Sequence, residues 1–408
     1  MAFAMLNSWT GLLRGLQVVL PSGGSVSMIW GLLVSTIGTF AMALSLAEVC
    51  HVYPTTGGQY DWTYFLAPPG SKRSLSFFVG WMASAGWIAL VATGSSLGST
   101  FVTNIISLWS ENYTAERWQT FLIYFGFTIG ALLLNLFAVR LLPLVDRAGF
   151  YWSLAGILIV TITLLARSSG NYQPAQNVFA EFVNETGWPD GIAFILGLLQ
   201  STFGLTGFDA ISHMVEEMPR PSITAPKVML MAVGLGASTS LVFMIVLLFC
   251  LTDLPTVLAS PTGPLLQIYY QATRSMAGAT GLVIFNLMAM VFATQGLMTV
   301  ASRIVLPFAR DQGFGPLSKS LREVHPTLKV PVWSISFVSA WTVIFGLIYL
   351  GSSVALNAIL SASVVFMQIS YIVPIFLLCW RGEAALENEQ RVWSLGRFRR
   401  RCKRVSEA

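Results

Sequence analysis

The amino-acid sequence predicts an all-α polytopic membrane protein, and three observations lead to this fold class. Hydrophobic residues make up 55% of the 408-residue chain, whereas charged residues make up only 10%. The mean hydropathy is +0.69. Apolar runs long enough to cross about 30 Å of hydrocarbon, at about 1.5 Å per helical residue, recur along the whole chain. Most of the chain is therefore expected to lie in a lipid bilayer.

About ten of these runs are candidates for membrane spans. In chain order we expect them at Ala2–Leu20, Val26–Ala47, Leu75–Trp109, Trp118–Leu142, Val145–Leu165, Gly191–Met214, Val228–Leu251, Gly278–Phe308, Val330–Leu350 and Ser353–Trp380. They predict a single transmembrane domain over residues 1–380, with two halves at roughly 1–167 and 190–380. Residues 381–408 are predicted to form a basic cytoplasmic tail.

The basic residues predict the orientation of these spans, because cytoplasmic loops retain more Lys and Arg than external loops. With both termini on the cytoplasmic side, only Arg117, Arg167 and Arg274 fall in external loops. The two Asn-x-Ser/Thr triplets, at Asn112 and Asn184, also fall in external loops. We therefore expect both asparagines to be glycosylation sites.

The composition argues against several classes of function. The formal net charge of +5 comes from basic residues in short loops and in the tail, so nucleic-acid binding is not expected. The four cysteines show no metal-ligand spacing, which predicts neither a disulfide framework nor a metal site. No nucleophile–base arrangement or phosphate-binding loop is recognisable, so we expect neither an enzyme nor a cofactor. The first span lacks the features of a cleavable signal peptide.

Two breaks in the apolar pattern mark a candidate binding site. Small and polar residues interrupt the first span at Asn7, Ser8, Trp9, Thr10 and Gly11. Glycines interrupt the sixth span, five spans later, at Gly204 and Gly207. A broken helix in lipid frees backbone groups that a solute, an ion or water must satisfy, and paired breaks are expected of an inverted-repeat transporter. The alternative is that the glycines only allow close helix packing.

Ionisable residues within the spans are a second functional signal, because a charge in lipid costs at least about 2.5 kcal/mol. The residues concerned are Arg14, Glu48, Asp209, His213 and Arg303. Asp209 directly follows the sixth-span break. Buried acids at such a position are candidates for a protonation change as a cavity opens. The alternative for Asp209 is a helix-capping role or an ion pair with Arg303 or Lys227.

Four stretches of the sequence carry a family resemblance: SLAEVCHVYPTTGGQYDWTYFLAPP, GFDAISHMVEEMPRPSITAPKVM, SRIVLPFARDQGFGPLS and VWSLGRF. With them the chain resembles the amino acid/polyamine/organocation superfamily, and most closely its fungal amino acid, choline and GABA permease branch. The resemblance implies a five-plus-five inverted-repeat (LeuT-type) helical bundle. It also implies secondary active transport of a small amine-bearing solute.

The same resemblance implies site residues. The substrate cradle is formed by Asn7, Ser8, Trp9, Thr10 and Gly11 in the first span and by Phe203, Gly204, Leu205, Thr206 and Gly207 in the sixth. Phe203 matches an aromatic position that lies across the substrate in related antiporters, and such a ring attracts an ammonium group by about 0.5–2 kcal/mol. The alternative for Phe203 is a core or lipid-facing aromatic. Trp81, Trp87 and Asn286 are further candidates for lining the cavity.

Gating and proton coupling are assigned to two acids. Asp209 matches a position where related antiporters place an acid linked to inner gating, and Glu48 is the second candidate. The predicted function is therefore proton-coupled permeation of an amino acid or a related amine such as GABA or choline. We expect alternating access across the plasma membrane, with the vacuolar membrane as the alternative location.

The ends of the chain differ from the family pattern. Relatives usually have twelve spans, whereas here a basic segment follows the tenth span, so the fold is expected to lack the last two. This departure supports an alternative function, either a non-transporting nutrient sensor or a truncated, inactive permease remnant.

Overall fold

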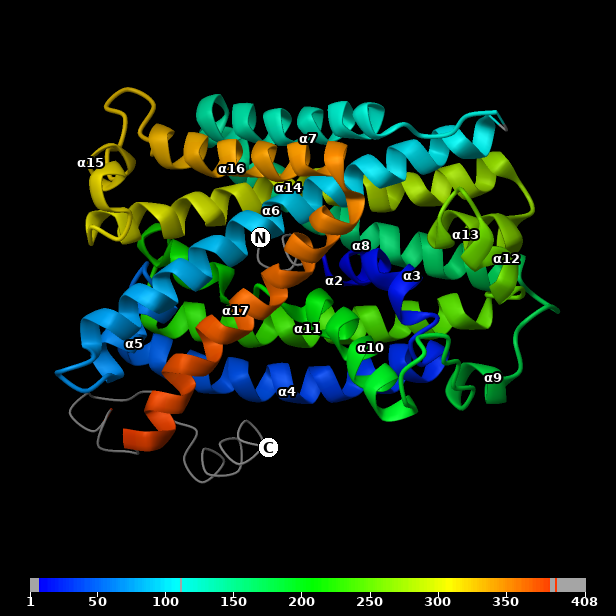
Figure 1. The fold of residues 1–408 in the computed structure, drawn as a ribbon, viewed down its shortest axis with the longest axis horizontal. Helices are drawn as coiled ribbons and strands as arrows, with labels where there is room; N and C mark the ends of the chain where they lie inside the picture. Colours follow the sequence, from blue (N-terminus) through cyan, green and yellow to red (C-terminus); the bar gives the residue numbers. More distant parts are fainter. Residues whose placement is uncertain (1–6, 111, 382–385, 387–408) are drawn as a thin grey trace.

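The computed structural model describes residues 7–110, 112–381 and Leu386, and Figure 1 shows the arrangement of the chain. Nearly all of the predicted tail lies outside the described residues. Within them, regular structure is helical apart from one isolated bridge between Ser22 and Asn184. Nine helices of the described chain are long and apolar enough to cross a membrane. The predicted all-α multi-pass architecture is confirmed.

These helices match the second to tenth predicted spans. Their bounds are α4 Gly24–Val52, α6 Lys72–Trp109, α7 Arg117–Phe137, α8 Leu142–Arg167, α10 Asp190–Leu205 continued by the 3₁₀ helix η3 Phe208–Glu217, α11 Pro221–Phe249, α14 Met276–Arg310, α16 Val332–Gly351 and α17 Ser353–Arg381. The shorter elements are η2 Val139–Leu141, α5 Gln59–Leu66, α9 Ala175–Phe179, α12 Leu254–Ala259, α13 Pro264–Thr273, η4 Gly315–Leu317 and α15 Ser318–Leu321.

The first predicted span is interrupted in its described part. It consists of α2 Ser8–Gly11, the 3₁₀ helix η1 Leu12–Gly15 and α3 Leu16–Val19, and residues 1–6 lie outside the described residues. Asn7 precedes α2 with φ 39° and ψ 47°, the left-handed conformation that asparagine tolerates better than most residues. Among the described residues, the polar stretch therefore forms the first helical turn.

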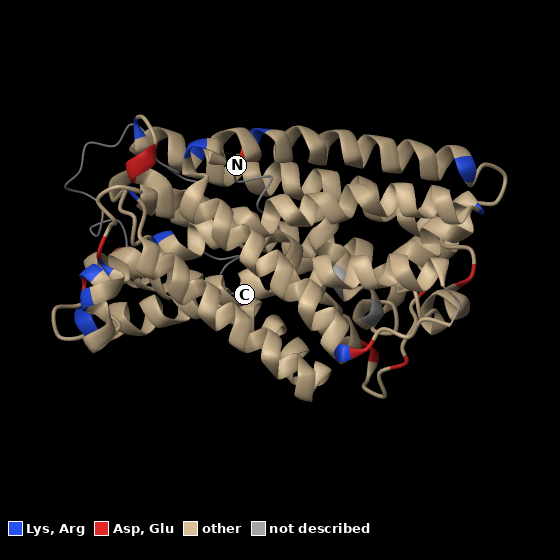
Figure 2. Cartoon of the chain, turned by 90° about the horizontal axis from the view of Figure 1, so that it is seen from above, with Lys and Arg blue, Asp and Glu red and all other residues tan. Residues whose placement is uncertain are grey.

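Long helices run side by side along the molecule, with α5 and α15 at one end and α9, α12 and α13 at the other (Figure 1). Charged residues gather mainly toward these two ends, which leaves a largely uncharged band between them (Figure 2). Large apolar side chains are exposed along the spans, among them Ile37, Phe137, Ile162, Val242 and Phe376. Such a band suits the hydrocarbon of a bilayer. The protein is a multi-pass membrane protein.

Two large apolar clusters form the core of the bundle. One contains Trp62 of α5, Phe208 of η3 and Tyr371 of α17. The other contains Trp9 of α2 and Tyr269 of α13. The chain passes from the second cluster to the first at the sixth-span break, so the break lies between the two cores.

Candidate substrate site

The sixth-span break lies at Thr206 and Gly207. Helix α10 ends at Leu205, Thr206 is extended with φ −78° and ψ 144°, and Gly207 has φ 95° before η3 begins. A left-handed φ costs other residues roughly 1–2 kcal/mol because Cβ clashes with the backbone, whereas glycine has no Cβ. Gly207 is therefore the residue that permits the break.

Gly204 is not at the sixth-span break, where the sequence pattern predicted it. It lies inside α10, and a Cβ there would be 2.5 Å from Cγ of Leu12 in η1. Its role in the structure is to let α10 and η1 cross closely, which is the packing alternative considered for the glycines. Leu205, the last residue of α10, is likewise buried in a core cluster rather than in the cavity described below.

The first-span break presents polar groups to the interior. The backbone amides of Thr10 and Gly11 donate to the Asn7 carbonyl over 3.0 and 2.8 Å. Asn7 Nδ2 and Ser8 Oγ are buried and have no hydrogen-bond partner among the described residues. Buried polar atoms are rarely left in this state, because each unmade bond costs about 1–3 kcal/mol. Both atoms are therefore candidates for binding a solute or water.

Three other predicted residues hold the first break in place. The Trp9 indole Nε1 donates to Ser153 Oγ over 2.8 Å. Asn286 Nδ2 donates to Thr10 Oγ1 over 3.1 Å, and Tyr269 donates its hydroxyl to Asn286 Oδ1 over 3.1 Å. Asn286 thus ties α2 to α14 and α13, and its contacts are with the protein.

A central cavity lies between the two breaks. It is lined by Gly11 of the first break, Trp87 of α6, Phe203, Thr206 and Gly207 of the second, and apolar residues of α6 and α14 that include Met290. Trp87 is fully buried, and its Nε1 has no hydrogen-bond partner among the described residues. The structure therefore brings five predicted site residues together around an apolar cavity with an unused donor.

An outer cavity of about 350 Å³ adjoins the central one. Its lining comes from α3, α6, α7, α10, α16 and α17 and includes the polar residues Ser96, Gln200 and Asn357. Phe203 and Leu97 line both cavities, so they lie between them. Phe203 thus separates the outer cavity from the central cavity.

On the other side of the break, five residues form what we call the inner network: Thr56, Gln59, Asp209, His213 and Tyr371. Asp209 is fully buried. Its Oδ1 accepts from the Tyr371 hydroxyl, which itself accepts from the Gly207 amide over 3.2 Å. Its Oδ2 accepts from Gln59 Nε2 and lies 3.1 Å from His213 Nε2. His213 Nδ1 lies 2.9 Å from the Thr56 carbonyl.

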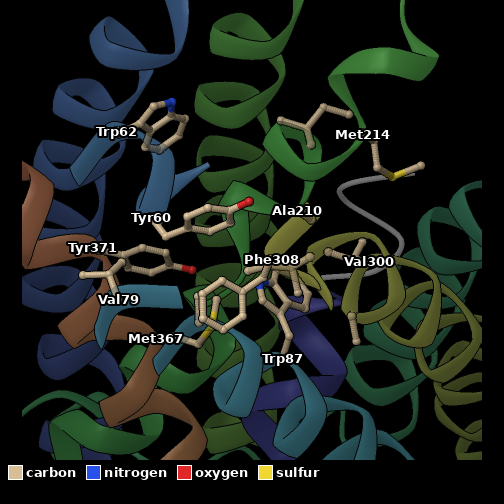
Figure 3. Close-up of a cluster of buried hydrophobic side chains, with 14 of the residues drawn as sticks. Tyr60, Trp62, Val79, Trp87, Ala210, Met214, Val300, Phe308, Met367 and Tyr371 are labelled. Atoms are coloured by element: carbon tan, nitrogen blue, oxygen red, sulfur yellow. The ribbon is translucent and has the colours of Figure 1, made fainter. Parts of the chain in front are cut away.

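The inner network joins η3 to α5 and α17 and closes this side of the break. Figure 3 shows Tyr371, Met367 and Phe308 around Trp87 in the buried cluster beside it. Nearer the end of the bundle, Arg303 Nε pairs with Glu217 Oε1 at 2.8 Å. Arg303, one of the two partners that the ion-pair alternative named for Asp209, therefore pairs with Glu217 instead.

The remaining candidates lie apart from the central cavity. Glu48 is fully buried on α4, between members of the cluster that surrounds the inner network. Trp81 is 40% exposed and packs against Phe308 and Phe314, so it does not line the cavity. The side chain of Arg14 lies outside the described part of the chain.

The two predicted glycosylation sites lie in loops toward the same end of the bundle as α9 and α13. Asn112 is exposed, directly after α6. Asn184 donates its Nδ2 to the Trp188 carbonyl over 2.7 Å and to Asp190 Oδ1 over 2.8 Å. Neither contact tests whether a glycan is attached.

Comparison with known proteins identifies the family. A family model described as amino acid permease matches residues 1–391. The chain belongs to the amino acid permeases. It is 36% identical over 377 residues to a putative amino acid/polyamine transporter of Macrophomina phaseolina, covering 92% of this chain and 83% of that one. It is 33% identical over 381 residues to the choline transporter of Saccharomyces cerevisiae, covering 92% of this chain and 67% of that one.

A solved structure supports the fold of this permease. The crystal structure of MhsT in complex with L-phenylalanine matches with a TM-score of 0.64 at 14% sequence identity, covering 100% of this chain and 97% of that one. The likeness confirms the predicted LeuT-type helical bundle. The family match and the curated relatives, not the fold, make the chain a membrane permease rather than an enzyme.

Proposed function

We propose that this permease moves an amino acid or a related amine by alternating access, with the solute bound in the central cavity. The observation that carries the proposal is the cavity itself, which joins two helix breaks and is lined by Trp87, a residue whose indole donor has no partner among the described residues. Breaks of this kind supply backbone groups to a substrate at mid-membrane. The two halves of the domain, at roughly 1–167 and 190–380, would then be the inverted repeats.

The polar groups at the cavity suit the two ends of an amino acid. The unused donor of Trp87 favours a carboxylate, because a charge-assisted hydrogen bond is about twice as strong as a neutral one, and Asn7 at the first break offers a second unused donor near the cavity residue Gly11. The ring of Phe203 suits an ammonium group. The similarity to a choline transporter supports an amine on the substrate. Choline has no carboxylate, so uptake experiments decide whether the substrate carries one. Thr10 and Gly204 then act as supports of the two breaks, while Ser8, whose Oγ has no partner among the described residues, is a further candidate for binding the solute.

The open and closed sides of the cavity give the direction of access. The outer cavity leads to Phe203 from one side, while the inner network seals the other. With both termini cytoplasmic, as the basic residues predict, the structure has its outer side open. Asp209, with Glu48 as the second acid, is the proposed point of proton coupling on the sealed side, in the plasma membrane.

The test is uptake into permease-deficient yeast that expresses this chain. A radiolabelled panel of neutral and basic amino acids, GABA, choline and polyamines is offered at acidic and at neutral external pH. Saturable uptake of one class, faster at acidic pH, is the expected result. Protein that reaches the membrane but takes up none of the panel would contradict the proposal and favour the sensor.

A matched pair of variants locates the site. Phe203→Ala removes the ring between the two cavities, and Phe137→Ala removes an equally large ring that is 70% exposed on α7. We expect the first to raise KM by roughly tenfold, since a desolvated cation–π contact is worth up to about 2 kcal/mol. The second is expected to leave KM unchanged. Equal effects of the two variants would remove the central cavity from the proposal.

A further inference from the structure

The hydrogen bonds of His213 fix how many protons it shares with Asp209. A backbone carbonyl only accepts hydrogen bonds, so the His213 Nδ1 atom that lies 2.9 Å from the Thr56 carbonyl must carry a hydrogen. In a neutral imidazole only one ring nitrogen carries a hydrogen. His213 Nε2 would then be a bare acceptor facing Asp209 Oδ2 at 3.1 Å. Two lone pairs do not form a hydrogen bond, so one further proton belongs to this contact.

The partners of the carboxylate place that proton. The Gly207 amide donates to the Tyr371 hydroxyl, so the single hydroxyl hydrogen is free to point at Asp209 Oδ1. Gln59 Nε2 donates to Oδ2. The remaining proton therefore lies between His213 Nε2 and Asp209 Oδ2, as an imidazolium beside a carboxylate or as a neutral imidazole beside a carboxylic acid. Both forms have zero net charge, which a fully buried pair requires.

We propose that His213 and Asp209 together hold the transported proton while the inner side is closed. The proposal rests on the proposed function and names a second residue for its proton coupling. When η3 moves away from α5, His213 loses the Thr56 carbonyl and Asp209 loses Gln59. Water then reaches the pair, and the proton bound from the outer side leaves to the inner side. The pair returns without a proton, as a neutral imidazole and a hydrated carboxylate.

The substrate cavity and the proton pair share a side chain. Trp87 lines the central cavity, and its ring meets His213 edge to face, with centroids 6.0 Å apart and planes at 86°. A solute that moves the indole would therefore also disturb the imidazole. This contact gives a physical route by which substrate and proton binding influence each other.

Other charged groups lie on the elements around η3. Asp61 of α5 interacts electrostatically with His213, and burial raises the pKa of Asp61 to about 6. The elements near η3 carry further titratable or charged groups, namely Glu48 and His51 of α4, Lys72 and Arg73 of α6, Asp146, Arg147 and Arg167 of α8, Lys227 of α11, Arg303 and Arg310 of α14, and Arg381 of α17, while Glu216 and Glu217 end η3 itself. Arg303 and Arg310 pair with Glu217 and Glu216, so their charges are balanced away from the proton pair.

The test compares His213→Gln with the matched control His51→Gln. His51 is also buried and also directs Nδ1 at a backbone carbonyl, that of Ser222 at 2.6 Å, but it forms no ion pair with a carboxylate among the described residues. Each protein is reconstituted into vesicles with a pH-sensitive dye inside. Substrate exchange at equal pH measures binding and gating, and substrate-driven acidification measures proton movement.

We expect His213→Gln to lose substrate-driven acidification by at least about tenfold while exchange stays within about threefold, because glutamine can bond to Thr56 but cannot titrate. Asp209→Asn should lose it equally, and the double variant should lose no more, since the two residues act as one unit. His51→Gln should acidify like the wild type. If the His213→Gln protein does not insert into the membrane, Asp209→Asn alone tests the proton pair by the same acidification assay.

Three outcomes overturn the proposal. The first is wild-type acidification by His213→Gln, and the second is an equal loss in His51→Gln. In the third, the wild-type protein exchanges substrate without moving protons, which refutes the proton pair but leaves the permease function intact. Wild-type protein that inserts and exchanges none of the panel refutes the proposed function itself.

Discussion

The unused indole donor at the central cavity gives the sharpest prediction for substrate binding. Trp87→Phe keeps an aromatic ring in the same place and removes only Nε1 and the outer part of the indole. If Nε1 donates to a substrate carboxylate, the variant loses a hydrogen bond to a charged group, worth about 1.5–3 kcal/mol. At about 1.4 kcal/mol per tenfold, affinity for an amino acid should fall by about tenfold to a hundredfold.

Folding should respond differently from binding. The indole is fully buried, so the smaller ring leaves a void that costs on the order of 1 kcal/mol. That cost is partly offset, because an unpaired buried donor is also removed. We therefore expect near-normal thermal stability of the purified variant without substrate. A smaller thermal shift on adding substrate should accompany the loss of affinity.

The assay is the substrate KM in yeast uptake, together with the thermal shift of purified protein. Trp81→Phe is the matched control, since Trp81 lies on the same helix but packs on Phe308 and Phe314 away from the cavity. For the decarboxylated amine of the same substrate, the Trp87→Phe variant should lose less than about threefold in affinity, because this amine has no carboxylate to accept a hydrogen bond from Nε1. An unchanged KM for the amino acid would refute the role of Nε1. Equal losses for acid and amine would show that the ring face binds instead.

Three other predictions concern the break, the pH dependence and the topology. Gly207→Ala should destabilise the protein by about 1–2 kcal/mol through its φ of 95°, whereas Gly234→Ala, at an open site on α11, should raise stability slightly; thermal unfolding in detergent measures both. Burial raises the pKa of Asp61 to about 6, so its contribution to stability is complete at low pH and is lost as pH rises through about 6. Asp61→Asn should therefore stabilise the protein above that pH by on the order of 1 kcal/mol after solvent screening, seen as a flatter profile of melting temperature against pH. Glycosidase treatment should increase gel mobility of the wild type but not of a double Asn112→Gln, Asn184→Gln variant, and an unchanged wild-type mobility would count against these sites.

The sequence predicted the spans well because hydropathy is a local property. Each of the nine long helices falls on a predicted apolar run, with ends that differ by several residues. The choice between Trp81 and Trp87 was also within reach, since six residues along a helix turn the side chain by about 240° and point the two indoles in different directions. Only one of them could line the cavity. The two glycines differ likewise, because Gly204 packs on Leu12 and Gly207 takes a positive φ.

The partners of Asp209 could not be predicted from local pattern. Gln59 is 150 residues away in the chain and Tyr371 is 162 residues away. Tyr371 stands in the tenth predicted span, where a single tyrosine resembles any core aromatic. Thr56 and Gln59 flank Gly57 and Gly58, two glycines that permit positive φ and close packing but identify no partner for the segment. Such contacts depend on how the helices pack, and no periodicity in one segment contains that information.

The two sides of the second break differ in the kind of contact that holds them. On the outer side, Gly204 of α10 packs closely on Leu12 of η1, a contact between carbon atoms that water cannot replace favourably. On the inner side, η3 is fixed by hydrogen bonds from Gln59, Tyr371 and His213. Water can take over each of these bonds at a small net cost, about 1 kcal/mol apiece. Opening of the inner side therefore replaces these hydrogen bonds by bonds to water, and it exposes the carboxylate and the imidazole that share the proton.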